Sequence, residues 1–271
     1  MSKFVFIGGG SMASCLIGGM LANGIEKSHI TVAEPNATAR QQLTELHGVN
    51  TTEDNLSAAS SAEVIILAVK PQIMRSVATH LALALNHKPT IISIAAGIPI
   101  AALENWLGTD LTLIRAMPNT PAMVQAGATG LYANRLLEAE EKGLVQNIFD
   151  TVGFTCWVAE ETLIDAVTAV SGSGPAYFFL IYEAMQRIGQ ELGLEPEIAA
   201  DLTLHTALGA ARLALALSQT PNELRQQVTS RGGTTQAAIE CFQSEGIEDV
   251  FRKAMNRALE RAQQMSAEFS E

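Results

Sequence analysis

The sequence is poor in cysteine. Cys15, Cys156 and Cys241 are its three cysteines, and they lie far apart in a chain of 271 residues. Because no Cys-x-x-Cys pair occurs and the number is odd, we predict neither a disulfide framework nor a zinc knuckle. The five histidines are scattered without the spacing of metal ligands. We therefore expect no metal site.

Positive charge is also scarce. Lys and Arg number 17 against 28 Asp and Glu, so the formal net charge is −11 with histidine neutral. A nucleic-acid surface needs clustered Lys and Arg, and we therefore expect no nucleic-acid partner. Small anionic ligands are still compatible with this charge, because helix N-termini and backbone N–H groups bind them locally.

Long uninterrupted apolar runs are missing as well. No apolar run reaches the roughly 20 residues of a membrane span without an interrupting glycine, proline or charge. We therefore expect no membrane partner and a cytoplasmic location. Hydrophobic residues still make up 48% of the chain, which is enough for a packed core. With 271 residues, the chain is expected to form one large or two smaller domains.

The apolar stretch from Phe4 to Gly24 has two interpretations. One is an export signal, with Lys3 in front and Cys15 as a lipoprotein-like cysteine. Such a signal needs an apolar helix of roughly 7–15 residues, whereas here three consecutive glycines follow residues 4–7. Glycines disfavour a helix and favour a sharp turn with positive φ. We therefore predict a strand over residues 3–7, a glycine turn, and a helix from Ser11, whose side chain could cap it.

The turn fits a dinucleotide-binding fingerprint. Its pattern is Gly8-x-Gly10-x-x-Ala13, with alanine in the third small position. The first glycine allows the turn, the second lets the backbone approach a pyrophosphate, and Ala13 lets the helix pack closely on the strand. Alone, the pattern is also compatible with an ordinary glycine-rich connection between a strand and a helix.

Strands and helices continue to alternate after this turn. Apolar, strand-like runs occur at residues 29–34, 63–69, 90–97 and 111–117, with helical segments between them. Glu34 ends the first of these runs, about twenty residues after the glycines, where an acid accepts hydrogen bonds from the adenosine ribose. The pattern predicts an α/β fold with a doubly wound parallel sheet, whose ligands lie beyond the carboxyl ends of the strands.

The second half of the chain is expected to be helical. After one more strand-like run at residues 153–159, helices are predicted at residues 163–171, 175–192, 196–217, 222–228, 235–244 and 247–270. We place the domains at residues 1–159 and 160–271. The helix at 196–217 is rich in Ala and Leu on most faces, which favours burial. Burial against another subunit and a place in the centre of the core are both compatible with this composition.

A glycine-rich break at residues 229–240 is the most informative in this half. Gly232 and Gly233 are followed by Thr234 and Thr235 at a predicted helix start. Free N–H groups and the helix dipole make such a start an anion site, here for a substrate carboxylate. The alternative is an ordinary helix start without a ligand.

Together these segments resemble the pyrroline-5-carboxylate reductase family. The motifs that carry the resemblance, in chain order, are "FIGGGSMA", "AVKPQ", "SIAAGI", "RAMPNTPA", "DAVTAVSGSGPAYF" and "SRGGTTQAAI". The resemblance implies a Rossmann dinucleotide-binding domain followed by an all-helical domain for substrate binding and dimerisation. It also implies an oxidoreductase that reduces 1-pyrroline-5-carboxylate to L-proline with NAD(P)H, the final step of proline biosynthesis. A homo-oligomer is implied, and a dimer and a decamer need the same buried helices.

The resemblance also implies roles for individual residues. Those implied along the cofactor are Gly8, Gly10, Ser11, Met12, Glu34, Asn36, Asn55, Ala68, Val69, Lys70, Pro71, Ala95, Ala96 and Gly97. Those implied around the substrate are Met117, Asn119, Thr120, Ser230, Gly232, Gly233 and Thr234. Thr235 is the implied catalytic residue, with its hydroxyl directed at the ring nitrogen of the substrate.

Two positions depart from the usual family pattern. Arg231 stands where the family usually has proline, and we expect its charge to supplement binding of the substrate carboxylate. Glu34 stands where members that prefer NADPH often have a small polar residue. Its carboxylate should repel a 2′-phosphate, so we expect a preference for NADH unless nearby Arg40 offsets that repulsion.

The reaction requires a positively polarised ring nitrogen and a hydride donor held about 3–3.5 Å from the imine carbon. A threonine hydroxyl is too weak an acid to donate a proton strongly, so Thr235 is expected to orient and polarise the substrate. The proton would come from an already protonated iminium or from water. A β-hydroxyacid dehydrogenase would need a lysine on the helix after residue 175, and none occurs between Ala176 and Gly193. A nucleotide-sensing scaffold without chemistry would not need the 230–235 loop.

Overall fold

The computed structural model describes residues 2–135 and 137–269. The chain divides into two compact units. The first comprises the residues up to Ser173 together with those from Arg257 onward, and the second is Gly174–Asn256. Each unit is described by itself below.

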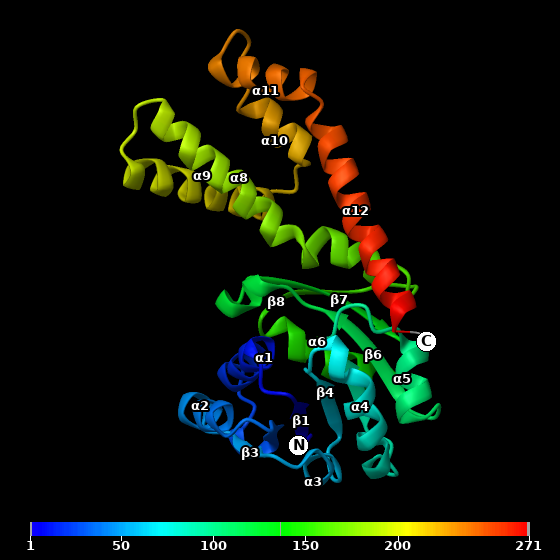
Figure 1. Ribbon diagram of the computed structural model, residues 1–271. Helices are drawn as coiled ribbons and strands as arrows, with labels where there is room; N and C mark the ends of the chain where they lie inside the picture. Colours follow the sequence, from blue (N-terminus) through cyan, green and yellow to red (C-terminus); the bar gives the residue numbers. More distant parts are fainter. Residues whose placement is uncertain (1, 136, 270–271) are drawn as a thin grey trace. The chain divides into compact units, whose positions relative to one another are not determined.

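The first unit is built on an eight-stranded sheet in the order β3-β2-β1-β4-β5-β6-β7-β8 (Figure 1). The strands are β1 (Phe4–Ile7), β2 (Ile30–Ala33), β3 (Asn50–Thr52), β4 (Val64–Leu67), β5 (Thr90–Ser93), β6 (Thr112–Met117), β7 (Gly127–Ala133) and β8 (Gly153–Trp157). The first six strands are parallel to one another. The predicted α/β class with a dinucleotide-binding topology is confirmed.

The sequence pattern predicted a parallel sheet, but the observed sheet is not wholly parallel. Strand β7 was not among the predicted strands, and it runs antiparallel to β6. Only residues 118–126 connect the two strands, which is too short for the crossover that a parallel pair needs. The connection is a 3₁₀ helix at Thr120–Val124. Strand β8 is again parallel to β7, because α6 provides the crossover between them.

Helices cover both faces of the sheet. One face packs against α1 (Ser11–Ala22), α2 (Ala37–His47) and α6 (Ala139–Asp150). The other packs against α3 (Asn55–Ala59), α4 (Pro71–Leu81) and α5 (Ile100–Leu107). Because both faces are covered, β1 and β4 are apolar and buried throughout, as the continuous apolar runs predicted.

A helical run joins the two units. It contains α7 (Leu163–Val167), a π-helical turn at Thr168–Gly172 and α8 (Gly174–Glu191). The predicted break before Pro175 is therefore absent, and the π turn takes its place. In the part of the chain that the structure describes, this run is also the one helix long and apolar enough, by length and composition alone, to cross a membrane.

The compact units divide at a different place from the predicted boundary at 159/160. Residues 161–173 pack with the sheet, because Arg115 of β6 pairs with Glu161. Gly130 of β7 also approaches this segment, and a Cβ on it would lie 2.7 Å from the methyl carbons of Val167. The end of α12 (Ile247–Glu268) belongs to the first unit as well.

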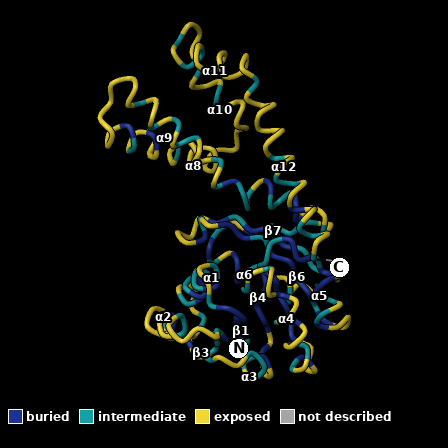
Figure 2. The backbone as a smooth tube through the Cα atoms, in the orientation of Figure 1, coloured by how far each residue is buried: buried dark blue, intermediate teal, exposed yellow. Residues whose placement is uncertain are grey.

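The second unit is all helical and mostly exposed (Figure 2). It contains α8, α9 (Pro196–Ala216), α10 (Pro221–Gln227), α11 (Thr234–Ser244) and the first part of α12. In α9 the buried residues are Ala199 and Thr203, whereas Leu215 is 88% exposed. The interpretation of this helix as a central core helix is therefore wrong for the single chain.

A buried ionic cluster attaches α7 to the sheet. Arg115, 4% exposed, donates from Nη1 to Glu161 Oε1 at 2.7 Å, and its Nη2 lies 3.8 Å from Asp165 Oδ1. Glu161 Oε1 also accepts a hydrogen bond from the backbone N–H of Ile100 at the start of α5. Burial raises the pKa of Asp165, and this effect outweighs the nearby Arg115 charge.

We predict that Asp165 makes the stability of the fold depend on pH. Because its folded pKa is raised, Asp165 favours folding while protonated, and this contribution is lost as the pH rises from about 4 through the folded pKa. In Asp165→Asn the free energy of unfolding, measured with urea, should therefore change less with pH over that window. The exposed Asp150→Asn variant is the control and should follow the wild-type profile. Parallel profiles for Asp165→Asn and wild type would contradict the prediction.

Candidate active site

The glycine turn follows β1 at the carboxyl edge of the sheet. Gly8 has φ +99°, and a Cβ on it would lie 2.7 Å from the carbonyl oxygen of Ala68, just after β4. Its N–H donates to the carbonyl oxygen of Ala33 at 2.8 Å. Glycine is therefore required here both by the positive φ and by the close approach of a neighbouring backbone.

Gly10 has a different role from Gly8. It is the N-cap of α1 with extended backbone, and a Cβ on it would meet nothing within 4 Å. The first intrahelical bond is from the N–H of Ser14 to the carbonyl of Gly10, and no side chain caps the helix. The N–H groups of Ser11, Met12 and Ala13 therefore precede the helical ladder, where a phosphate binds. The sequence suggested Ser11 as the cap, but Ser11 already lies in the helix and Gly10 is the N-cap.

Glu34 directs its carboxylate toward the glycine turn. Its Oε2 accepts from the N–H of Gly9 and its Oε1 from the N–H of Asn36, both at 2.9 Å. The Asn36 side chain itself caps α2 by accepting from the N–H of Ala39 at 3.0 Å. A carboxylate can accept about four hydrogen bonds, so Glu34 keeps capacity for ribose hydroxyls.

Arg40 lies beside this carboxylate, and its guanidinium already bonds to other protein groups. Its Nη1 donates to the carbonyl oxygens of Glu34 at 2.7 Å and Pro35 at 2.9 Å. Its Nη2 pairs with Glu53 at 3.4 Å. The guanidinium thus fixes the backbone after β2, and part of its charge is offset by Glu53.

The other predicted cofactor residues follow neighbouring strands on the same edge. Ala68, Val69, Lys70 and Pro71 follow β4, Ala95, Ala96 and Gly97 follow β5, and Asn55 begins α3. Gly97 has φ +74°, and a Cβ on it would lie 2.8 Å from the Met265 side chain of α12. The C-terminal helix therefore packs on the turn after β5, which the sequence pattern did not predict.

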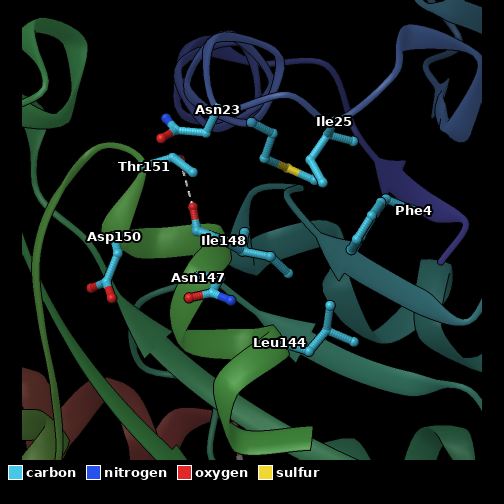
Figure 3. A pocket seen from close by; sticks show the side chains of 9 residues that line it. Phe4, Asn23, Ile25, Leu144, Asn147, Ile148, Asp150 and Thr151 are labelled. Carbon is cyan, nitrogen blue, oxygen red and sulfur yellow. Dashed lines mark hydrogen bonds between the residues drawn. The ribbon is translucent and has the colours of Figure 1, made fainter. Parts of the chain in front are cut away.

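Two cavities lie near the α1 region. One, of about 300 Å³, adjoins Gly9, Gly10 and Ser11 between α1 and α2. A second, of about 350 Å³, lies at the amino end of β1, where Phe4 and Ile148 form part of its wall and Asn147 and Asp150 its rim (Figure 3). The second cavity contains none of the predicted site residues.

The loop after β6 holds the predicted residues Met117, Asn119 and Thr120. Thr120 is exposed at the start of the 3₁₀ helix. Asn119 is buried, and its amide donates to the carbonyl of Ser171 and accepts from the N–H of Ala128. Met117 lies against Gly172, where a Cβ would be 2.6 Å from the Met117 Cε.

The predicted substrate loop belongs to the second unit. Gly232 has φ +75°, and Gly233 is the N-cap of α11 with no side-chain cap. The N–H of Gly232 donates to Gln236 Oε1 at 2.6 Å and that of Gly233 to the carbonyl of Ser230 at 3.0 Å. These two N–H groups therefore have partners within the loop.

The first turn of α11 offers further N–H groups. The first intrahelical bond is from Ala237 to Gly233, so the N–H groups of Thr234, Thr235 and Gln236 precede it. Sequence reasoning missed Gln236, whose side-chain oxygen accepts the hydrogen bond of the Gly232 N–H. Its position four residues after Gly232, one helical turn along, is the signal that could have revealed it.

Comparison with known proteins gives the family. The family model described as "Pyrroline-5-carboxylate reductase dimerisation" matches residues 161–265, and that described as "NADP oxidoreductase coenzyme F420-dependent" matches residues 3–97. The pyrroline-5-carboxylate reductase of Pseudomonas aeruginosa is 45% identical over 269 residues, covering 99% of this chain and 98% of the relative. This chain belongs to the pyrroline-5-carboxylate reductase family.

Solved structures agree with this family. A pyrroline-5-carboxylate reductase from Coxiella burnetii superposes with a TM-score of 0.94 at 43% identity, covering 98% of both chains. A pyrroline carboxylate reductase from Plasmodium falciparum, with NADP bound, has a TM-score of 0.86 at 28% identity and covers 98% of both chains. A 3-hydroxyisobutyrate dehydrogenase from Mycobacterium tuberculosis, at 16% identity and a TM-score of 0.52 over 72% of this chain and 67% of its own, shares the fold alone.

We predict that replacing the two glycines of the fingerprint by alanine has different effects on stability and on cofactor binding. Gly8→Ala should destabilise the fold by more than about 1 kcal/mol, because alanine is strained at positive φ and meets the Ala68 carbonyl. Gly10→Ala should cost less than this, because Gly10 has a negative φ and a Cβ on it meets no protein atom. It should nevertheless weaken NAD(P)H binding in a fluorescence titration. Equal losses of stability in urea unfolding would contradict this distinction.

Proposed function

We propose that this chain reduces 1-pyrroline-5-carboxylate to L-proline with NAD(P)H, in the final step of proline biosynthesis. The observation that carries the proposal is the full-length likeness to pyrroline-5-carboxylate reductases, 45% identical over 99% of the chain. The uncapped N-terminus of α1 and the open space at Gly10 fit a dinucleotide pyrophosphate. The assay is substrate-dependent oxidation of NAD(P)H, with proline-dependent reduction of NAD(P)⁺ at alkaline pH as the reverse test.

The two units are proposed to supply different parts of the reaction. Residues after β1, β2, β4 and β5 hold the cofactor, which supplies the hydride when bound. The first turn of α11 presents N–H groups to the substrate carboxylate, and the helix dipole favours that negative charge. Gln236 must release the Gly232 N–H if that group is also to bind the carboxylate.

Thr235 is proposed to orient and polarise the substrate ring nitrogen. Its hydroxyl is a weak acid and needs only to hold a hydrogen bond to that nitrogen. The proton comes from an iminium that is already protonated or from water. Removing a hydrogen bond to a charged group costs about 1.5–3 kcal/mol, which corresponds to roughly 10- to 100-fold in rate.

We predict that Thr235→Ala lowers kcat by about 10- to 100-fold. The Kd of NAD(P)H should be unchanged, because the cofactor residues lie on other elements. Steady-state kinetics and a fluorescence titration measure the two quantities. An unchanged kcat would remove Thr235 from the mechanism.

In the same assay Arg231→Pro should raise the KM for the imine, and an equal or lower KM would show that the Arg231 charge does not assist carboxylate binding.

A preference for NADH over NADPH is proposed from the contacts of Glu34. Its carboxylate already accepts hydrogen bonds from the N–H groups of Gly9 and Asn36, which a 2′-phosphate would need as donors. The negative charge of the carboxylate also repels that phosphate. Arg40 does not compensate, because backbone carbonyls and Glu53 already engage its guanidinium.

We predict that Glu34→Ser shifts the coenzyme preference toward NADPH. The variant removes the repulsion and frees two backbone donors, so the ratio of kcat/KM for NADH to that for NADPH should fall about 10- to 100-fold. Glu53→Gln is the matched control, since it frees Arg40 from a carboxylate but leaves Glu34 in place, and it should change the ratio much less. A ratio unmoved by Glu34→Ser would refute the assignment.

A homo-oligomer is proposed, with a dimer as its smallest form and a decamer as a possible larger assembly. Large apolar side chains are exposed on α8 and α9, among them Phe178, Phe179 and Leu202 at 57%, 61% and 54%. These helices lie within the segment that matches the dimerisation model. A second subunit explains this exposure better than a membrane, because the start of the helical run is tied to β6 through Arg115 and Glu161. A cytoplasmic location is proposed with it.

A further inference from the structure

The Asn119 side chain is buried and bonds to protein through both ends of its amide. It is 8% exposed, its Nδ2 donates to the carbonyl of Ser171 at 3.0 Å, and its Oδ1 accepts from the N–H of Ala128 at 2.9 Å. The amide ties the loop after β6 to the start of β7 and to the π turn.

The Ser171 carbonyl needs this partner because of Pro175. In an α-helix the carbonyl of residue 171 accepts from the N–H of residue 175, and proline has none. The Asn119 amide supplies the missing donor. Neighbouring groups also adapt to the π turn, since the N–H of Ser173 donates to the Thr168 carbonyl and the Ser171 hydroxyl to the Val167 carbonyl.

One face of β6 makes two further contacts with this segment. Residues 115 and 117 alternate in β6, so their side chains share that face, and Asn119 lies two residues beyond the end of the strand with extended backbone. Arg115 pairs with Glu161, Met117 lies against Gly172, and Asn119 bonds to Ser171. The path of the chain from α7 to Ser173 is thus fixed by the strand whose carboxyl end borders the reaction site.

We propose that Asn119 is a positioning residue that holds the π turn by replacing the N–H that Pro175 lacks. Given the proposed function, the residues before Ser173 bind the cofactor and those of the 230–235 loop bind the imine. The π turn is where the chain passes from one unit to the other. Asn119 acts on the reaction through this turn, and it does not touch the substrate.

The test begins with Asn119→Asp, which keeps the acceptor for Ala128 but places an acceptor opposite the Ser171 carbonyl. We expect kcat to fall about 10- to 100-fold, as misplacement by about 1 Å does, with the Kd of NAD(P)H unchanged. Asn134→Asp is the matched control. Asn134 likewise accepts from the N–H of Leu113 and donates to the carbonyl of Leu111, but at the amino end of β6. It should lose stability without losing kcat.

The decisive variant is Asn119→Asp combined with Pro175→Ala. Alanine restores an N–H at position 175 that can bond the Ser171 carbonyl, so the double variant should recover most of the lost kcat, while Pro175→Ala alone should change kcat little. Amide hydrogen exchange at residues 168–173 should rise in Asn119→Asp and fall again in the double variant. This readout does not depend on the reaction, so it tests the π turn even if wild type fails to reduce the imine.

Two outcomes would overturn the proposal. A rise in the KM for the imine, with kcat unchanged and no recovery from Pro175→Ala, would make Asn119 a substrate ligand. A loss of stability equal to that of Asn134→Asp, with full kcat in the folded protein, would leave Asn119 a purely structural residue.

Discussion

The close approach of two parallel strands at their carboxyl ends is the constraint on which the cofactor edge depends. Gly8 passes so near the carbonyl of Ala68 that no side chain fits between β1 and β4. This approach turns the chain sharply into α1 and leaves the first N–H groups of that helix open beside Gly10. An anion site results from backbone geometry alone, which explains how a chain of net charge −11 can bind a pyrophosphate.

Glu34 holds two turns of the fold together and is also the residue proposed to recognise the adenosine ribose. It bonds to Gly9 in the turn and to Asn36 at the start of α2, so it connects the ends of β1 and β2. Arg40 braces the backbone behind it through the carbonyls of Glu34 and Pro35. The proposed coenzyme preference therefore depends on groups that the fold already holds in place.

Strand β6 links the sheet to the helical half of the chain. Its buried Arg115, Met117 and the following Asn119 all contact residues 161–172. This segment packs with the sheet although it belongs, by sequence, to the dimerisation region. Beyond it, α8 and α9 expose large apolar side chains that a single chain leaves uncovered. The sheet is therefore covered on both faces within one chain, whereas these helices keep large apolar side chains exposed.

Local patterns by themselves determined most of the elements and their type. The apolar runs of β1, β2, β4, β5 and β6 and the glycine turns were predictable, because short buried strands and positive φ leave clear signals in residue type. Strand β7 was not, since its Gly- and Ala-rich sequence lacks such a signal and its direction follows from a short connection. The bonds of Glu34 to Gly9 and of Asn119 to Ser171, 25 and 52 residues apart, were decided by tertiary structure alone. The physical reason is that a side chain's hydrogen-bond partner depends on which distant backbone groups the packing brings within reach.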